Sequence, residues 1–135
     1  MEKKYLSWDD IEDAVERLAT NIKANNASIE AITGLPRGGL IPAVMLSHKL
    51  DIPYIDANGN FEEYDNILIV DDICDSGHTL KQHHQFFTTA TLHYKTSAVV
   101  EPDFWWKLAS ENEWIVYPWE REDSKTIPDY ATKGK

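Results

Sequence analysis

Three aspartates follow a short apolar run in the middle of the chain, at a spacing that could surround a phosphorylated sugar. Residues 67–70 are apolar and lead directly into Asp71 and Asp72, and Asp75 comes three positions later. Adjacent carboxylates repel each other, so both stay ionised near neutral pH only when a cation or hydroxyl donors compensate them. A ribose together with a magnesium ion would supply both kinds of partner.

The residues after these aspartates could hold a phosphate group. Ser76, Gly77, His78 and Thr79 form a turn that leads into an expected helix. Backbone N–H groups and two hydroxyls would converge there, and the helix dipole favours an anion at its N-terminus by about 0.3–1 kcal/mol. We therefore expect a sugar 5′-phosphate to bind at this turn.

Periodic patterns around these residues predict an α/β fold. Ser7 is expected to cap a first helix, with Asp10 at its third position. Pro42 suits the first turn of a second helix, and residues 79–87 can form a third. The expected strands cover residues 29–35, 53–56, 67–70, 91–100 and 114–117. Strands that alternate with helices predict a Rossmann-like parallel sheet flanked by helices.

A parallel sheet of this kind binds its ligand beyond the carboxyl ends of its strands. The apolar run 67–70 is typical of a strand buried on both faces, so we expect it at the sheet centre, with Asp71 and Asp72 at the mouth of the crevice. The 135 residues suit one domain over 1–135, with a polar tail from about residue 121.

Composition narrows the classes of partner. The formal net charge of −10 argues against nucleic acid, because the field of the whole molecule repels polyanions. The apolar runs are too short to span a bilayer, and the first residues lack the apolar stretch of a secretory signal. With Cys74 as the one cysteine, no internal disulfide can form, and we expect a cytoplasmic protein without a membrane partner.

The segment from residue 67 to residue 80 resembles the signature that binds 5-phosphoribosyl-1-pyrophosphate (PRPP) in type I phosphoribosyltransferases. That signature is an apolar strand, two acidic residues, two variable positions, Asp, Thr or Ser, Gly, a variable residue and Thr. A buried strand followed by solvated acids would explain one or two aspartates, but not the ordered Asp-Ser-Gly-x-Thr.

Three further segments extend the resemblance over most of the chain. The loop Pro36, Arg37, Gly38 and Gly39 resembles the loop that binds the pyrophosphate of PRPP in this family. Residues 114–120 resemble the segment of purine phosphoribosyltransferases in which an aromatic ring stacks on the base, although a plain core strand is an alternative. By that resemblance Trp114 covers the base, Ile115 offers backbone contacts to its edge, and Glu120 lies near the metal and pyrophosphate.

Lys95 matches a lysine that donates to the oxygen at purine C6 in this family, although Thr96 replaces the usual following proline. The family resemblance therefore implies magnesium-dependent transfer of the phosphoribosyl group of PRPP to a 6-oxopurine, as in purine salvage. It implies that Asp75 accepts the purine proton and that Arg37 stabilises the departing pyrophosphate. It also implies a homodimer or homotetramer.

In the implied site Asp71 and Asp72 grip the ribose hydroxyls, with Asp72 nearer the magnesium ion. One departure from the family is a shortened flexible loop, because residues 55–64 leave room only for a tight turn at Asn58 and Gly59. A PRPP or nucleotide sensor without catalysis is therefore an alternative. A phosphoacceptor receiver domain would also use strand-end aspartates with magnesium, but it needs neither the Ser-Gly-x-Thr turn nor the arginine loop.

Overall fold

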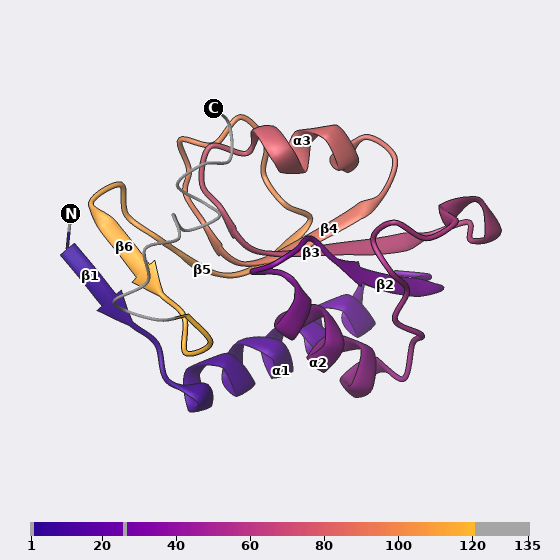
Figure 1. Cartoon of the computed structure of the whole chain (residues 1–135), viewed down its shortest axis with the longest axis horizontal. Helices are drawn as coiled ribbons and strands as arrows, with labels where there is room; N and C mark the ends of the chain where they lie inside the picture. Colours follow the sequence, from indigo (N-terminus) through magenta and orange to yellow (C-terminus); the bar gives the residue numbers. More distant parts are fainter. Residues whose placement is uncertain (1, 26, 121–135) are drawn as a thin grey trace.

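A computed structural model describes residues 2–25 and 27–120 of the chain. Within these ranges the strands form two parallel sheets, one of four strands and one of two (Figure 1). The larger sheet has the order β2 (Ala31–Gly34), β3 (Ile67–Cys74), β4 (Thr88–Tyr94) and β5 (Phe104–Leu108). The smaller sheet pairs β1 (Glu2–Tyr5) with β6 (Glu113–Val116).

Helices cover both faces of the larger sheet. Helices α1 (Trp8–Ala24) and α2 (Leu40–Leu50) lie together on one face, and α3 (His78–His84) lies over the other (Figure 1). A short 3-10 helix, η1 (Phe61–Glu63), precedes β3. The predicted α/β fold with a parallel sheet flanked by helices is therefore confirmed.

The first helix begins as its sequence predicts. The Ser7 Oγ accepts a hydrogen bond from the Asp10 N–H at 3.1 Å, and the Asp10 carboxylate accepts one from the Ser7 N–H at 2.9 Å. This reciprocal pair satisfies two N–H groups that the helix itself leaves without partners. The apolar side chains that α1 buries against the sheet are Ile11, Ala14, Val15, Leu18, Ala19 and Ile22.

Strand β3 lies in the interior of the larger sheet, between β2 and β4. Its side chains alternate between two apolar clusters, so Leu68 and Val70 pack with α1 and α2 while Ile67 and Ile69 face the opposite side. Burial on both faces explains why every position of residues 67–70 is apolar. The prediction that this run occupies the sheet interior is confirmed.

The predicted end of this strand was wrong. We expected the strand to end at residue 70, before Asp71 and Asp72, but β3 continues to Cys74. Asp71 lies opposite Thr91, and Cys74 lies opposite Tyr94 in the ladder with β4. The two carboxylates accept the N–H groups of the residues that follow them, which lets charged side chains remain in a buried strand.

Other boundaries differ because turns outside the strands compete for the backbone. The strand predicted over 91–100 is β4, which runs from Thr88 to Tyr94. After it, the Ala98 N–H donates to Lys95 O, and the Val99 N–H donates to Ser76 O. The strand predicted over 53–56 is only a bridge between Tyr54 and Ile32.

Two strands escaped prediction. Strand β1 is exposed at all four positions, so it has no apolar alternation to reveal it. Strand β5 covers Phe104–Leu108, a stretch in which no strand was predicted. The helix predicted over 79–87 is also shorter, because α3 ends at His84.

The connection from α2 to β3 is compact. A turn forms where the Gly59 N–H donates to Asp56 O at 2.8 Å, and η1 follows it. The turn predicted at Asn58 and Gly59 is therefore present. No described helix has the length and apolar character needed to cross a bilayer. The polar tail predicted from about residue 121 lies outside the described residues.

Candidate active site

The loop over residues 36–39 meets the end of β3 at the carboxyl edge of the larger sheet, and Gly38 marks the point of contact. A Cβ atom on Gly38 would lie 2.0 Å from Asp72 Oδ2, and one on Gly39 would lie 2.3 Å from Val70 O. These separations leave no room for a side chain at either position. The predicted arginine loop and the predicted acidic segment are therefore brought together.

The arginine loop is held against β3 by its own backbone. The Leu35 N–H donates to Val70 O at 2.9 Å, and the Gly39 N–H donates to Leu35 O at 2.9 Å. The peptide bond between Pro36 and Arg37 is cis. Both of these residues are exposed, while Gly38 behind them is buried. Arg37 thus stands at the surface beside a fixed backbone.

The acid pair is almost completely enclosed by protein. Asp71 and Asp72 are each 2% exposed. Asp71 Oδ1 accepts the Asp72 N–H at 2.9 Å, and Asp72 Oδ1 accepts the Ile73 N–H at 2.7 Å. Hard cations prefer carboxylate oxygens, and magnesium usually takes one or two carboxylates together with substrate oxygens. The chemistry of this pair therefore fits a magnesium ion.

The turn between β3 and α3 is held by the loop that follows β4. Gly77 has a φ of 83°, in the left-handed region that favours glycine. The Val99 N–H donates to Ser76 O at 2.9 Å, and the Lys81 N–H donates to Gly77 O at 2.9 Å. Thr79 lies in the first turn of α3 beside the exposed His78. These four predicted phosphate-binding residues form one continuous turn.

Lys95 joins the acidic turn to the smaller sheet. Its Nζ lies 3.4 Å from Asp75 Oδ1 and donates to Glu113 O at 3.4 Å. The lysine is 1% exposed, and the Asp75 side chain is 26% exposed. An ammonium group buried this deeply requires close acceptors, because burial in an apolar environment penalises its charge. Two predicted site residues, each directly after the end of a different strand, are thus in contact.

Trp114 and Ile115 lie on β6 and differ in exposure. Trp114 is half-buried, and Lys3 Nζ of β1 lies 4.8 Å from the centroid of its ring. Ile115 is 1% exposed and packs in the main core. Side-chain packing therefore fixes Ile115, while Trp114 keeps part of its ring accessible.

Glu120 stabilises the turn that follows β6. Its Oε1 accepts the Tyr117 N–H at 2.8 Å, and its own N–H donates to Tyr117 O at 3.0 Å. Over the described ranges, no three His, Cys, Asp or Glu side chains gather as a ready-made metal site. A magnesium ion at Asp71 and Asp72 would accordingly need oxygens from a bound substrate.

Sequence reasoning missed a buried chain of hydrogen bonds behind the acid pair. Tyr117 is fully buried, and its hydroxyl donates to Asp72 O at 3.1 Å. The same hydroxyl lies 2.9 Å from Nδ1 of His93. Burial lowers the pKa of His93 to about 4, so its ring is neutral near pH 7. The signal available in the sequence was the spacing of His93 and Lys95, which would share one face of the strand predicted over residues 91–100.

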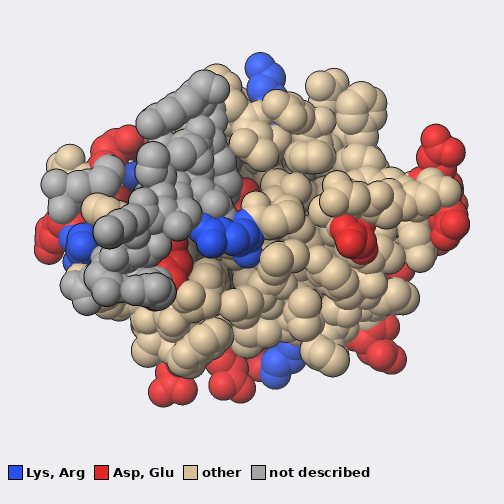
Figure 2. All heavy atoms as spheres, in the orientation of Figure 1, with Lys and Arg blue, Asp and Glu red and all other residues tan. Residues whose placement is uncertain are grey.

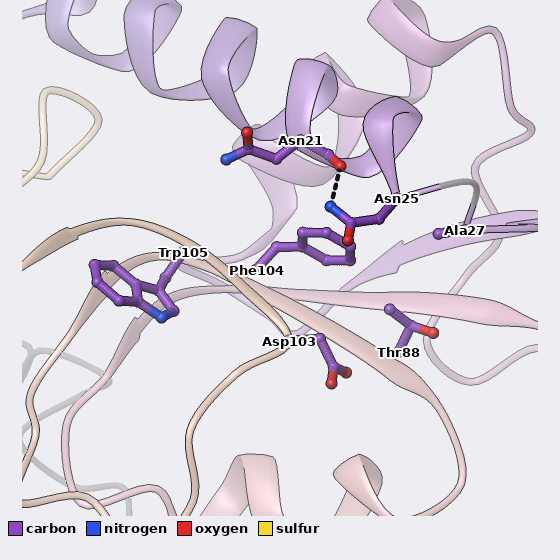
Figure 3. Close-up of a pocket in the computed structure, with 7 residues that line it drawn as sticks. All are labelled: Asn21, Asn25, Ala27, Thr88, Asp103, Phe104 and Trp105. Carbon is purple, nitrogen blue, oxygen red and sulfur yellow. Dashed lines mark hydrogen bonds between the residues drawn. The ribbon is translucent and has the colours of Figure 1, made fainter.

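A surface pocket of about 530 Å³ lies at the other end of the strands (Figure 3). It opens beside Thr88 and Phe104, the first residues of β4 and β5. The polar groups there already have protein partners: Asn25 Nδ2 donates to Asn21 O, and Asp103 Oδ2 accepts the Thr89 N–H. Position and chemistry thus separate this pocket from the site at the carboxyl edge.

Charge on the surface agrees with the acidic composition. Acidic side chains lie along much of the rim of the face drawn in Figure 2, with basic side chains scattered between them. An anionic ligand must therefore be attracted by local backbone N–H groups, Arg37 or a bound cation.

Comparison with known proteins finds phosphoribosyltransferases among the similar sequences and structures. No family model matches the chain. A xanthine-guanine phosphoribosyltransferase from Cereibacter sphaeroides is 30% identical over 143 aligned residues, which cover 86% of each protein. The crystal structure of a purine phosphoribosyltransferase from Pyrococcus horikoshii superposes with a TM-score of 0.73 at 32% identity, covering 95% of this chain and 99% of that one. A xanthine-guanine-hypoxanthine phosphoribosyltransferase from Helicobacter pylori superposes with a TM-score of 0.73 at 27% identity, covering 88% and 94%.

The parallel sheet, the acidic strand end and the adjoining glycine loop therefore define a phosphoribosyltransferase of the type I fold. With these relatives, the chain belongs to the xanthine-guanine phosphoribosyltransferase family. The predicted resemblance of the chain to the type I phosphoribosyltransferases is confirmed.

Proposed function

We propose that this phosphoribosyltransferase transfers the phosphoribosyl group of PRPP to a 6-oxopurine and releases pyrophosphate. The observation that carries the proposal is the contact between Gly38 and the Asp72 carboxylate. It joins a loop suited to pyrophosphate with carboxylates suited to ribose hydroxyls, and in PRPP the pyrophosphate on C1 and the hydroxyl on C2 are on adjacent carbons. The named relatives act on xanthine, guanine or hypoxanthine, which supports a 6-oxopurine as the acceptor.

The reaction forms a bond between C1 of the ribose and a purine nitrogen, and it breaks the bond from C1 to the pyrophosphate oxygen. Positive charge develops at C1 and negative charge on the leaving group. The Arg37 guanidinium and the N–H groups of its loop stabilise the pyrophosphate. Asp71 and Asp72 accept hydrogen bonds from the ribose hydroxyls, which fixes the sugar for attack.

Asp75 accepts the proton that the purine loses. Its carboxylate is partly exposed, so a base can reach it, and the Lys95 ammonium lies 3.4 Å away. Lys95 also suits the oxygen at purine C6, because an ammonium donates to a carbonyl oxygen. In the same proposal Trp114 stacks on the base, and the Ile115 backbone contacts the base edge.

A magnesium ion would be held by Asp72 and Asp71 together with substrate oxygens, with Glu120 near it. The ion would supply charge that stabilises the departing pyrophosphate. The turn from Ser76 to Thr79 would bind the 5′-phosphate, which leaves the reacting C1 between the two loops. The acid pair supports this assignment because carboxylate oxygens are the ligands that magnesium prefers in proteins.

We further propose a cytoplasmic enzyme that works as a homodimer or homotetramer. Cys74, the one cysteine of the sequence, is buried and its thiol donates to Val100 O at 3.3 Å, which agrees with a reducing compartment. Val44 of α2 is 40% exposed on the helix that follows the arginine loop, which supports an apolar contact between subunits there. The mass measured by light scattering tests this assignment, and a monomer would contradict it.

A panel of bases tests the proposed reaction. The protein is incubated with PRPP and magnesium and with guanine, xanthine, hypoxanthine or adenine, and pyrophosphate release is measured. We expect release with at least one 6-oxopurine, little with adenine, and none when magnesium is chelated. If PRPP binds but no base releases pyrophosphate, the protein is a sensor and the transfer proposal fails.

A further inference from the structure

Tyr117 links the two halves of the proposed site from the inside of the protein. Its backbone continues directly from β6, the strand that carries Trp114 and Ile115. Its hydroxyl reaches Asp72 O at 3.1 Å, in the strand that carries the acid pair. Tyr117 is fully buried, so it acts on any ligand only through these neighbours.

The proton positions along this chain follow from the donors available. A tyrosine hydroxyl has one proton, and a carbonyl oxygen can only accept, so the Tyr117 proton points to Asp72 O. In the 2.9 Å contact between Tyr117 and His93, the proton must then be on His93 Nδ1. His93 therefore donates to Tyr117, and Tyr117 donates to Asp72.

Further contacts hold Tyr117 at its other end. Its ring is stacked on Trp119 with centroids 5.0 Å apart and planes 4° apart, and its N–H donates to Glu120 Oε1 at 2.8 Å. These contacts bind Tyr117 to the segment after β6. Tyr117 thus connects that segment to the backbone of Asp72, whose carboxylate lies against the arginine loop.

A second connection runs parallel to the first. Lys95 lies two positions beyond His93, directly after the end of β4, and its ammonium contacts Asp75 and Glu113 O. Side chains two apart on a strand point to the same face. His93, through Tyr117, and Lys95 therefore each connect the acidic segment to the base segment.

We propose that Tyr117 is a positioning residue that couples binding at the PRPP half of the site to binding at the base half. The inference rests on the proposed function and adds a residue that neither the fold nor the family signature assigned. The hydrogen bonds of Tyr117 hold β3 and the segment after β6 in one arrangement. A ligand that contacts both segments therefore binds more tightly than it would without these bonds. The affinity of a ligand that contacts the acidic segment alone depends little on these bonds.

The variant Tyr117→Phe tests the coupling, because it removes the hydroxyl and keeps the ring that stacks on Trp119. We expect GMP, which spans both segments, to bind about three- to tenfold more weakly by calorimetry, the size of one lost hydrogen bond. PRPP with magnesium should change by less than about twofold. In turnover assays the KM for the purine should rise by a similar factor while the KM for PRPP stays close to that of the wild type.

Tyr94→Phe is the matched control. Tyr94 is 8% exposed on β4, one position from His93, and lies in a different apolar cluster. We expect the affinities for GMP and PRPP to remain unchanged in this variant. The coupling is overturned if Tyr117→Phe weakens both ligands equally, if it weakens neither, or if it lowers only the melting temperature.

His93→Gln gives the same test if Tyr117→Phe does not fold. It removes the imidazole donor and leaves the hydroxyl, so the affinity for GMP should again fall more than the affinity for PRPP. Equal losses would overturn the inference in that variant as well. Failure of the proposed function is seen separately, because wild-type protein would then release no pyrophosphate with any base before a variant is compared.

Discussion

The backbone of Gly38 lies against the carboxylate of Asp72, with room for a hydrogen atom and for no larger group. Gly38→Ala would force the arginine loop or the carboxylate to move, because a Cβ would lie 2.0 Å from Asp72 Oδ2. A displacement of about 1 Å at a reacting centre lowers the rate by about 100-fold. We expect kcat/KM for PRPP to fall by about that factor, as measured by pyrophosphate release.

Gly59→Ala controls for the general effect of adding a methyl group to a tight turn. There a Cβ would meet Asp56 O at 2.9 Å, in the connection before η1. We expect that variant to retain the kcat/KM of the wild type, even if its melting temperature falls. Equal activity of the Gly38→Ala and wild-type proteins would contradict the role of this contact.

Asp75→Asn keeps the shape of the side chain and removes its capacity to accept a proton. Loss of a general base typically lowers turnover by about 100- to 10 000-fold. We expect kcat to fall in that range while the KM for PRPP changes by less than about threefold, because PRPP is held mainly by other groups. Steady-state kinetics with each substrate varied in turn measures both constants.

Asp103→Asn is a suitable control, because Asp103 lies beside the pocket at the other end of the strands. That variant should keep its turnover. If Asp75→Asn lowers the affinity for PRPP as much as it lowers kcat, Asp75 is a ligand of the sugar and not the general base.

Lys95→Met tests whether the buried ammonium recognises the base. The substitution leaves Asp75 without its ion pair and Glu113 O without its donor. A hydrogen bond from a charged group contributes about 1.5–3 kcal/mol, so the KM for a 6-oxopurine should rise about 10- to 100-fold. Competition between hypoxanthine and adenine measures the loss of preference for an oxygen at C6.

The exposed Lys107, whose Nζ lies 4.4 Å from the centroid of the Trp106 ring, provides a control of the same residue type. Lys107→Met should leave the preference between bases unchanged. An unchanged preference in Lys95→Met as well would mean that Lys95 serves only the ion pair.

The buried His93 predicts how stability depends on pH. Burial lowers its pKa from 6.5 to about 4, so the unfolded chain binds a proton between these values while the folded protein does not. The contribution of His93 to the free energy of unfolding is therefore fully present above about pH 6.5. It is lost as the pH drops toward 4, by roughly 3 kcal/mol in total. Urea unfolding at several pH values measures this dependence.

His93→Gln should flatten this part of the pH profile. Part of the slope will remain, because burial also lowers the pKa of His83. His48→Asn, at an exposed position of α2, should leave the slope as it is in the wild type. The acidic groups act at lower pH, since backbone hydrogen bonds lower the pKa values of Asp10 and Glu113. A slope that is the same in His93→Gln and the wild type would contradict the assignment.

Local signals in the sequence predicted the elements whose causes are themselves local. The Ser7 cap and the apolar face of α1 lie within a few residues of each other, and both were correct. The run 67–70 was apolar throughout because the sheet buries both of its faces. The acidic segment and the arginine loop were recognised as ordered motifs, and the structure brings them into contact through Gly38 and Asp72.

Contacts between distant segments explain what the sequence did not reveal. Asp71 and Asp72 look like loop residues, but pairing with β4 keeps them in a strand. Strand β1 is exposed throughout and exists because it pairs with β6. The contacts of Tyr117 with Asp72 and His93 leave no local pattern, because each side chain alone is an ordinary member of a buried core.

Parallel pairing of β1 with β6 sets the order in which the protein can be completed during synthesis. Glu2 lies opposite Glu113, and Tyr5 lies opposite Val116, so the first strand of the described residues can pair only after the last of them has left the ribosome. Strands β2 to β5 can assemble before that moment, because contacts between nearby segments form faster than contacts between distant ones. A nascent chain therefore acquires the loops assigned to phosphate before it acquires the platform assigned to the base.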